Sequence, residues 1–313
     1  IDSQVGSWYV STHPASIFVV GLSAALVTDE ARWNLRGRNL GGSCFTTQTG
    51  GVPAHNDLIA AIELDCLHVP PSVGTSVYLR VVGQEEVPHQ VDMQRPGDPA
   101  AKAWRVATSL PELGAKRYGF GTYVAANYDD LIDHPVEMGD FALATFKAHG
   151  VPHDIVITGR VPNLDMARLS TDLKAICEAQ IEFFEPRTKK APMDRYVFLT
   201  LAVGDGYGGL EHRASTALIC DRNDLPSTTA AKAAEPGEGY LKFLGLCSHE
   251  YFHTWNVKRI KPSVFAPYDL QAENYTPLLW LFEGFTSYYD DLMLVRAGII
   301  GEPTYFKLLG KTV

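Results

Sequence analysis

The segment that follows Gly239 constrains the fold of this chain more than any other part of the sequence. It reads YLKFLGLCSHEYFHTWNVK, and its apolar majority predicts a helix buried deep inside a domain. His249 and His253 are four residues apart, so on this helix they stand one turn apart on the same face. Two imidazoles placed in this way can bind one metal ion.

Glu250 lies beside the first histidine in the sequence SHEYFH. It is close enough to take a proton from a metal-bound water without being a ligand itself. This H-E-x-x-H pattern is typical of zinc peptidases. The alternative is structural, with both histidines only forming hydrogen bonds inside a buried helix.

A catalytic zinc site needs three protein ligands and an open position for water, so a third donor is expected on a neighbouring element. The segment LLWLFEGFTSYYDDL supplies Glu283, a single acid after five consecutive apolar residues. A carboxylate buried in such surroundings must pair or bind a metal. Ser287, Asp290 and Asp291 follow on the same face, and one of them could accept the second ring N–H of a zinc-bound histidine. The alternative is that the two aspartates are solvated charges.

The motif GGLEH consists of Gly208, Gly209, Leu210, Glu211 and His212 and runs into a strand-like segment. Adjacent glycines in a strand often mark the close approach of another backbone, such as a peptide substrate that adds to the edge of a sheet. Glu211 could then bind a free α-ammonium group, which favours an exopeptidase. The alternative is a turn formed by the two glycines, followed by a surface glutamate.

The length of 313 residues favours two domains. We expect a mainly β domain over residues 1–126, where short extended pieces alternate with Gly, Pro and polar turns. Residues 127–313 should form a mixed domain, because strands such as HDIVITG and RYVFLTLAV accompany a helix over Leu164–Phe183. The expected fold class is α+β. The extended pieces are Ser16–Val20, Ala60–Leu67, Ser76–Val82 and Tyr118–Ala126.

Charge and cysteine content bound the partners and the compartment. The net charge of −9 argues against nucleic acid, and no apolar run reaches the roughly 20 residues that a membrane span needs. The basic cluster of Lys258, Arg259 and Lys261 would complement the dipole of the preceding helix, with a clamp for a substrate carboxylate as the alternative. The five scattered cysteines fit free thiols in the cytoplasm, and Cys247 is expected to pack rather than bind metal.

Together the stretches GGLEH, HEYFHTWNVKRIKP and LLWLFEGFTSYYDDL resemble the glycyl aminopeptidase family of gluzincin metallopeptidases, whose members often carry a PDZ domain. The segments TSVYLRVVGQ (Thr75–Gln84) and LIDHPVEMGDF (Leu131–Phe141) are also similar to that family. The resemblance covers residues 75–313. The first 70 or so residues do not resemble the family's usual opening.

The resemblance implies a thermolysin-like catalytic domain over residues 127–313 with one Zn²⁺ per chain. His249, His253 and Glu283 would be the zinc ligands and Glu250 the general base. GGLEH is similar to the G-A-M-E-N element of larger aminopeptidases, so Glu211 would bind the substrate amine. The implied activity is removal of small N-terminal residues, glycine or alanine, from peptides with a free N-terminus.

Related aminopeptidases use a tyrosine well beyond the glutamate ligand to stabilise the oxyanion, and this chain ends at Val313. The resemblance therefore implies a chain truncated before a helical region and a PDZ domain. The alternative is that Tyr251 or Tyr288 supplies the oxyanion group. The oligomeric state stays open.

Two other functions are compatible with these motifs. One is a zinc endopeptidase, in which Glu211 has no amine to bind. The other is a peptide-binding scaffold with a catalytically incomplete zinc site. Glu250 argues against the scaffold, since a purely structural zinc site needs no base.

Overall fold

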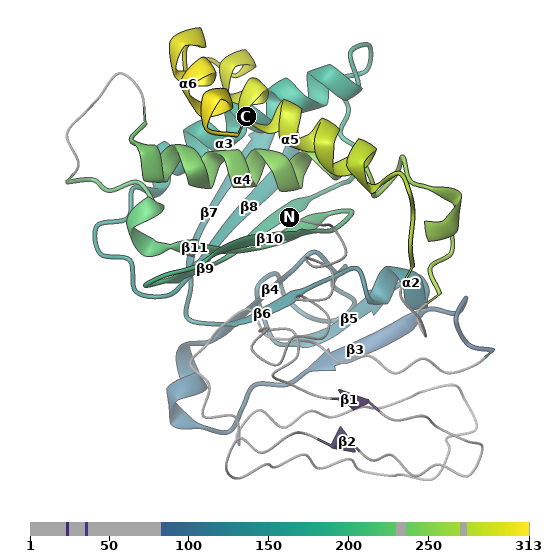
Figure 1. Cartoon of the computed structure of the whole chain (residues 1–313). Coiled ribbons are helices and arrows are strands. Elements are labelled where there is room, and N and C mark those ends of the chain that lie inside the picture. The colour runs from purple at the N-terminus through teal and green to yellow at the C-terminus, as the bar shows by residue number, and fades with distance from the viewer. Residues whose placement is uncertain (1–22, 25–34, 37–82, 230–235, 270–273, 313) are drawn as a thin grey trace, which may run out of the picture. The chain divides into compact units, whose positions relative to one another are not determined.

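The computed structural model describes residues 23–24, 35–36, 83–229, 236–269 and 274–312. The expected extended pieces at Ser16–Val20, Ala60–Leu67 and Ser76–Val82 lie outside these residues. By its internal contacts the chain divides into two compact units, Ile1–Asp140 and Phe141–Val313 (Figure 1).

The described part of the first unit is built mainly from paired strands. Three antiparallel pairs form, β1 with β2, β3 with β5, and β4 with β6. Because β4 pairs with β6, residues 127–140 stay with this unit, and the boundary expected after residue 126 falls inside it. The elements are β1 (Ser23–Ala24), β2 (Leu35–Arg36), β3 (His89–Met93), η2 (Pro99–Ala103), β4 (Arg105–Thr108), β5 (Gly121–Ala125), α2 (Tyr128–Leu131) and β6 (Val136–Gly139).

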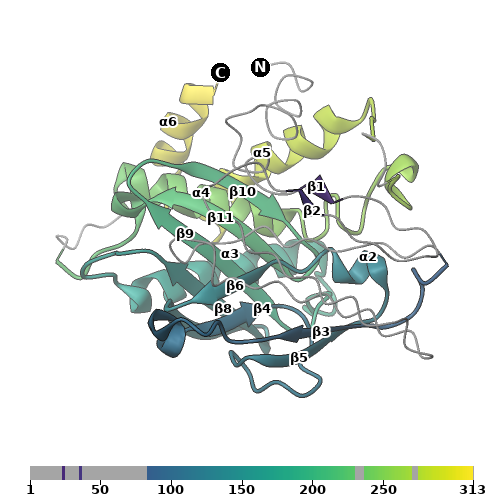
Figure 2. The same ribbon diagram turned by 90° about the horizontal axis from the view of Figure 1, so that it is seen from below.

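The second unit is a five-stranded sheet. Its helices lie on one face of that sheet (Figures 1 and 2). The strand order is β10-β11-β9-β8-β7; the three inner strands run parallel, and the two outer strands are antiparallel to their neighbours. The strands are β7 (Ala142–Ala148), β8 (Val151–Thr158), β9 (Tyr196–Val203), β10 (Tyr207–Glu211) and β11 (Ser215–Asp221). The helices are α3 (Met166–Phe184), η3 (Arg222–Asp224), α4 (Glu238–Phe252), η4 (Ser263–Phe265), α5 (Leu279–Arg296) and α6 (Glu302–Thr312).

The core of the second unit lies between α3, α4 and the sheet. The predicted helix over Leu164–Phe183 is confirmed as α3, which begins after Asp165 because that side chain accepts a hydrogen bond from the Arg168 backbone N–H. The described fold is a mixed α/β structure, in agreement with the expected class. Among the described residues, no helix is both long and apolar enough to cross a lipid bilayer.

The helix that carries the two histidines is shorter than predicted. The apolar pattern predicted helix as far as Lys258, whereas α4 ends at Phe252 and His253 is its C-cap. The chain then turns, with the backbone N–H of Lys258 donating to the carbonyl of His253 at 3.1 Å. Val257 has a φ of 131°, which no helix allows.

Candidate metal centre

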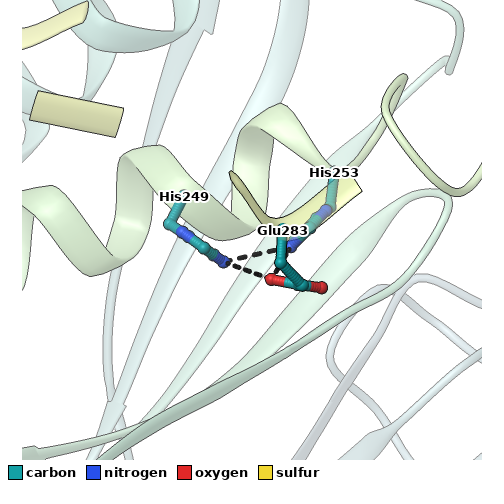
Figure 3. A group of neighbouring side chains, drawn as sticks. All are labelled: His249, His253 and Glu283. Carbon is teal, nitrogen blue, oxygen red and sulfur yellow. Dashed lines mark hydrogen bonds and ion pairs between the residues drawn. The ribbon is translucent and has the colours of Figure 1, made fainter. Parts of the chain in front are cut away.

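Three side chains from two helices converge in the second unit (Figure 3). His249 lies near the end of α4, His253 caps that helix, and Glu283 lies near the start of α5. The two Nε2 atoms are 3.1 Å apart. Oε2 of Glu283 lies 3.4 Å from Nε2 of His249 and 3.6 Å from Nε2 of His253. The three predicted ligands are therefore brought together, and each offers one atom that could bind a metal, called here its donor atom, to the same point.

The other ring nitrogen of each histidine is engaged elsewhere. Nδ1 of His249 donates to Oδ2 of Asp290 at 3.1 Å, and Nδ1 of His253 donates to the carbonyl of Asn256 at 2.7 Å. Because a carboxylate and a carbonyl only accept, both Nδ1 atoms carry a proton, and in the neutral rings the lone pairs lie on Nε2. Two facing lone pairs beside a carboxylate repel each other unless a cation lies between them.

The spacing and the electrostatics fit a divalent metal ion. Ligand atoms of a tetrahedral ion with bonds of about 2.0–2.1 Å are about 3.3 Å apart, close to the distances between these three donors. Burial lowers the pKa of His249, but hydrogen bonds to Asp290 and Glu283 outweigh it and raise that pKa to about 10. Partial burial raises the pKa of Glu283, while hydrogen bonds to the two histidines outweigh it and hold that pKa well below its usual range. The site thus favours positive charge at the point where the donors meet.

Asp290 positions His249 and also joins the two helices. Of the three candidates Ser287, Asp290 and Asp291, it is the one that accepts the ring N–H, so this prediction is confirmed. Its backbone carbonyl accepts a hydrogen bond from Oγ of Ser248 at 2.7 Å. One residue of α5 therefore holds two consecutive residues of α4.

Replacing Asp290 with asparagine is expected to weaken zinc binding by about 10- to 100-fold, because an amide no longer fixes the tautomer and orientation of His249. Competition with a chromophoric chelator measures the affinity. The matched control is Asp291→Asn, since the Asp291 carboxylate lies against Gly245 and not against a histidine. An equal loss in both variants would mean that the hydrogen bond to His249 is unimportant.

The turn after α4 fixes the second histidine. While its carbonyl accepts from His253, the side-chain amide of Asn256 donates to the carbonyl of Phe282 and to Oγ1 of Thr286, both at 3.0 Å. The positive φ of Val257, a β-branched residue, costs about 1–3 kcal/mol. Backbone strain of this kind persists only where the surroundings enforce it, so the turn is held in one conformation.

Glu250 is a buried carboxylate beside the converging donors. Its exposed fraction is 5%, and Oε2 has no hydrogen-bond partner among the described residues. Burial raises the pKa of Glu250 to about 7, His249 opposes this shift, and Glu211 adds to it. A carboxylate with this pKa and a free oxygen is suited to accept and return a proton near neutral pH.

Gly209 of β10 lies directly against this carboxylate. A Cβ at Gly209 would be 2.2 Å from Oε1, 2.5 Å from Cδ and 2.6 Å from Cγ of Glu250, whereas one at Gly208 would meet nothing within 4 Å. The close approach expected at the two glycines therefore exists at one of them, and it is made by a side chain of α4. Only a residue without a side chain fits at Gly209.

Glu211, the last residue of β10, reaches the same place. Its carboxylate, that of Glu250 and a ring nitrogen of His253 lie within 4.8 Å of one another. Nζ of Lys258 lies 3.6 Å from Oε1 of Glu211. The first four residues of the GGLEH motif thus lie on the outer strand β10, and His212 comes directly after it.

Two expectations about the site require correction. Glu283 is only partly buried, with a side chain that is 49% exposed. Of the five apolar residues before it, only Phe282 is buried. Tyr251 is fully buried, and its hydroxyl is hydrogen-bonded to Nε2 of His153 at 2.9 Å, so it cannot serve an oxyanion. Tyr288 is 53% exposed on α5.

The sequence patterns did not indicate that Asn256 and Thr286 belong to the site, or that Lys258 forms an ion pair within it. The basic cluster does not act as one group: Arg259 donates to three carbonyls, including that of Thr254 just beyond the C-cap of α4, whereas Lys258 pairs with Glu211. Cys247 is buried and free, as expected.

Two segments of the chain match family models. Residues 242–313 match the M61 glycyl aminopeptidase, and residues 72–140 match the peptidase M61 N-terminal domain. This chain is also similar to a solved crystal structure of an aminopeptidase N family protein from Idiomarina loihiensis, with 46% sequence identity and a TM-score of 0.68. The match covers 73% of this chain and 37% of that chain. The described chain therefore spans well under half of that relative.

A second similarity is short. Over 40 residues, 13% of this chain, the sequence is 75% identical to an arylamine N-acetyltransferase of Mycolicibacterium smegmatis. It is 70% identical over the same length to the arylamine N-acetyltransferase of Mycobacterium tuberculosis strain ATCC 25618 / H37Rv. The chain spans 14% of each of these curated relatives, which is too little to carry an activity.

Proposed function

Because this chain belongs to the glycyl aminopeptidase family, as its motifs predicted, we propose that it is a zinc-dependent aminopeptidase. The observation that carries the proposal is the meeting of His249, His253 and Glu283, with both Nε2 atoms within 3.6 Å of Oε2 of Glu283. These three residues would hold one Zn²⁺. The helices on one face of the sheet support a thermolysin-like catalytic unit.

Bound there, Zn²⁺ would supply Lewis-acid activation of water and of the peptide carbonyl. Glu250 takes the proton from the attacking water on its free Oε2 and returns it to the leaving amine. Gly209 leaves this carboxylate the space it needs. The outer strand β10 can pair with an extended peptide, so that the scissile bond lies beside Glu250.

Glu211 would determine which peptide bond is cleaved. The carboxylate of Glu211 stands at the end of β10 and within 4.8 Å of the Glu250 carboxylate. It can therefore bind an α-ammonium group next to the scissile bond. Cleavage would then remove one residue from peptides with a free N-terminus. The preference for glycine or alanine is part of the proposal and comes from the family alone.

Removing the substrate's positive charge is expected to abolish most of the activity. We expect a glycyl anilide to be hydrolysed at least about 100-fold faster than its N-acetylated form, because acetylation deletes the ammonium group that pairs with Glu211. Glu211→Gln should bring the two rates close together. The measurement is kcat/KM for both substrates with both proteins at one zinc per chain.

Equal rates for the free and acetylated anilides would favour an endopeptidase. Hydrolysis of neither, with zinc bound, would favour the peptide-binding scaffold. A preparation that binds no zinc would contradict the proposed ligands.

A further inference from the structure

Lys258 is a cation placed beside the proposed amine-binding carboxylate. Its Nζ lies 3.6 Å from Oε1 of Glu211, and the side chains of Lys258 and Glu211 are only 14% and 23% exposed. Charges that are shielded from water in this way interact more strongly than those of an exposed pair. The Lys258 ammonium is therefore part of the electrostatic environment of the site.

The backbone around Lys258 leaves it little freedom to move away. Its N–H donates to the carbonyl of His253 at 3.1 Å, and the preceding Val257 is held at a φ of 131°. The guanidinium of the next residue, Arg259, donates to the carbonyls of Thr254, Arg213 and Pro192 at 2.6, 3.2 and 2.8 Å. A turn anchored on both sides of Lys258 keeps its side chain directed at Glu211.

From this geometry we propose that Lys258 is a specificity-determining residue that selects against substrates whose first residue carries a second positive charge. The inference rests on the proposed function, in which Glu211 binds the α-ammonium group. An ammonium about 2.8 Å from the same oxygen, Oε1 of Glu211, would lie at most about 6.4 Å from Nζ of Lys258, which is less than one Debye length at physiological salt. A lysyl side chain would bring another cation into the same region.

The sharpest probe compares two substrates that differ only in charge. Lysyl and norleucyl anilides have side chains of similar length and the same α-ammonium group, so their ratio of kcat/KM isolates the side-chain charge. In the wild-type chain the norleucyl substrate should be preferred. In Lys258→Met, the lysyl-to-norleucyl ratio should rise about tenfold, which corresponds to about 1.4 kcal/mol.

Two control variants test whether charge at this position is responsible. Lys258→Arg keeps the charge and should keep the wild-type ratio. Lys261→Met removes a cation from the same basic cluster, one whose Nζ lies 5.3 Å from the centre of the Tyr268 ring, and should leave the ratio unchanged. A purely structural role of Lys258 would change both rates by the same factor, and an unchanged ratio in Lys258→Met would overturn the inference.

Failure of the proposed function gives a different result. If the wild-type chain with zinc bound hydrolyses neither anilide, the aminopeptidase proposal fails, and the selectivity is measured by binding instead. Calorimetric affinities of lysinamide and norleucinamide for the wild-type chain and for Lys258→Met then provide the same ratio. A tenfold relative gain for lysinamide supports the role of Lys258, and equal changes for both amides contradict it.

Discussion

Replacing Glu250 with glutamine is expected to leave zinc bound and to lower kcat for a glycyl anilide by about 10²- to 10⁴-fold. Glutamine keeps the size of the side chain but cannot take a proton from water. The loss should appear in kcat, because Glu250 is not one of the three converging donors His249, His253 and Glu283. Metal content per chain and steady-state kinetics measure the two quantities on the same preparation.

The matched control is Glu238→Gln on the same helix. Glu238 lies in the first turn of α4, its side chain is 75% exposed, and it pairs with Lys311. This variant should keep full turnover. If Glu250→Gln were as active as Glu238→Gln, the general base would have to be another residue.

Adding a single methyl group at Gly209 is expected to cost about 100-fold or more in turnover. The new Cβ would overlap Oε1, Cδ and Cγ of Glu250, so the whole carboxylate must move and not only its tip. A displacement of about 1 Å at a catalytic group is enough for a loss of this size. Zinc content should not change, because the three atoms nearest the new Cβ all belong to Glu250, which is not one of the three proposed ligands.

Gly208→Ala is the comparison for this experiment. It adds the same methyl group one residue earlier on β10, where nothing lies within 4 Å, and should therefore cost far less. The ratio of the two losses separates the collision with Glu250 from any general effect on the strand. Similar losses in both variants would contradict the proposed contact.

The sequence predicts the parts of the site that depend on helical spacing. His249 and His253 meet because four residues make about one turn, and Asp290 reaches His249 because it lies two turns beyond Glu283 on the same helix. Such relations need only the knowledge that a segment is helical. The same holds for α3, whose apolar period and N-terminal aspartate are local signals.

Other parts could not be predicted, because they depend on tertiary packing. An apolar run does not indicate which of its residues face the core. Of the five apolar residues before Glu283, only Phe282 is buried. The turn at Val257 contradicts the preference of a β-branched residue for negative φ, so no propensity would place Lys258 against Glu211. The contact of Gly209 with Glu250 joins a strand and a helix about 40 residues apart in the chain.

The positions of the three donors also have a consequence for unfolding. His253 at the C-cap of α4 and Glu283 on α5 are separated by about 30 residues of chain, so an ion bound by both would close a long loop. Because the unfolded chain does not offer the donors together, binding free energy becomes folding free energy for both helices. Binding of the proposed ion would make metal supply control how often α4 and α5 separate, and with that how long the second unit survives proteolysis.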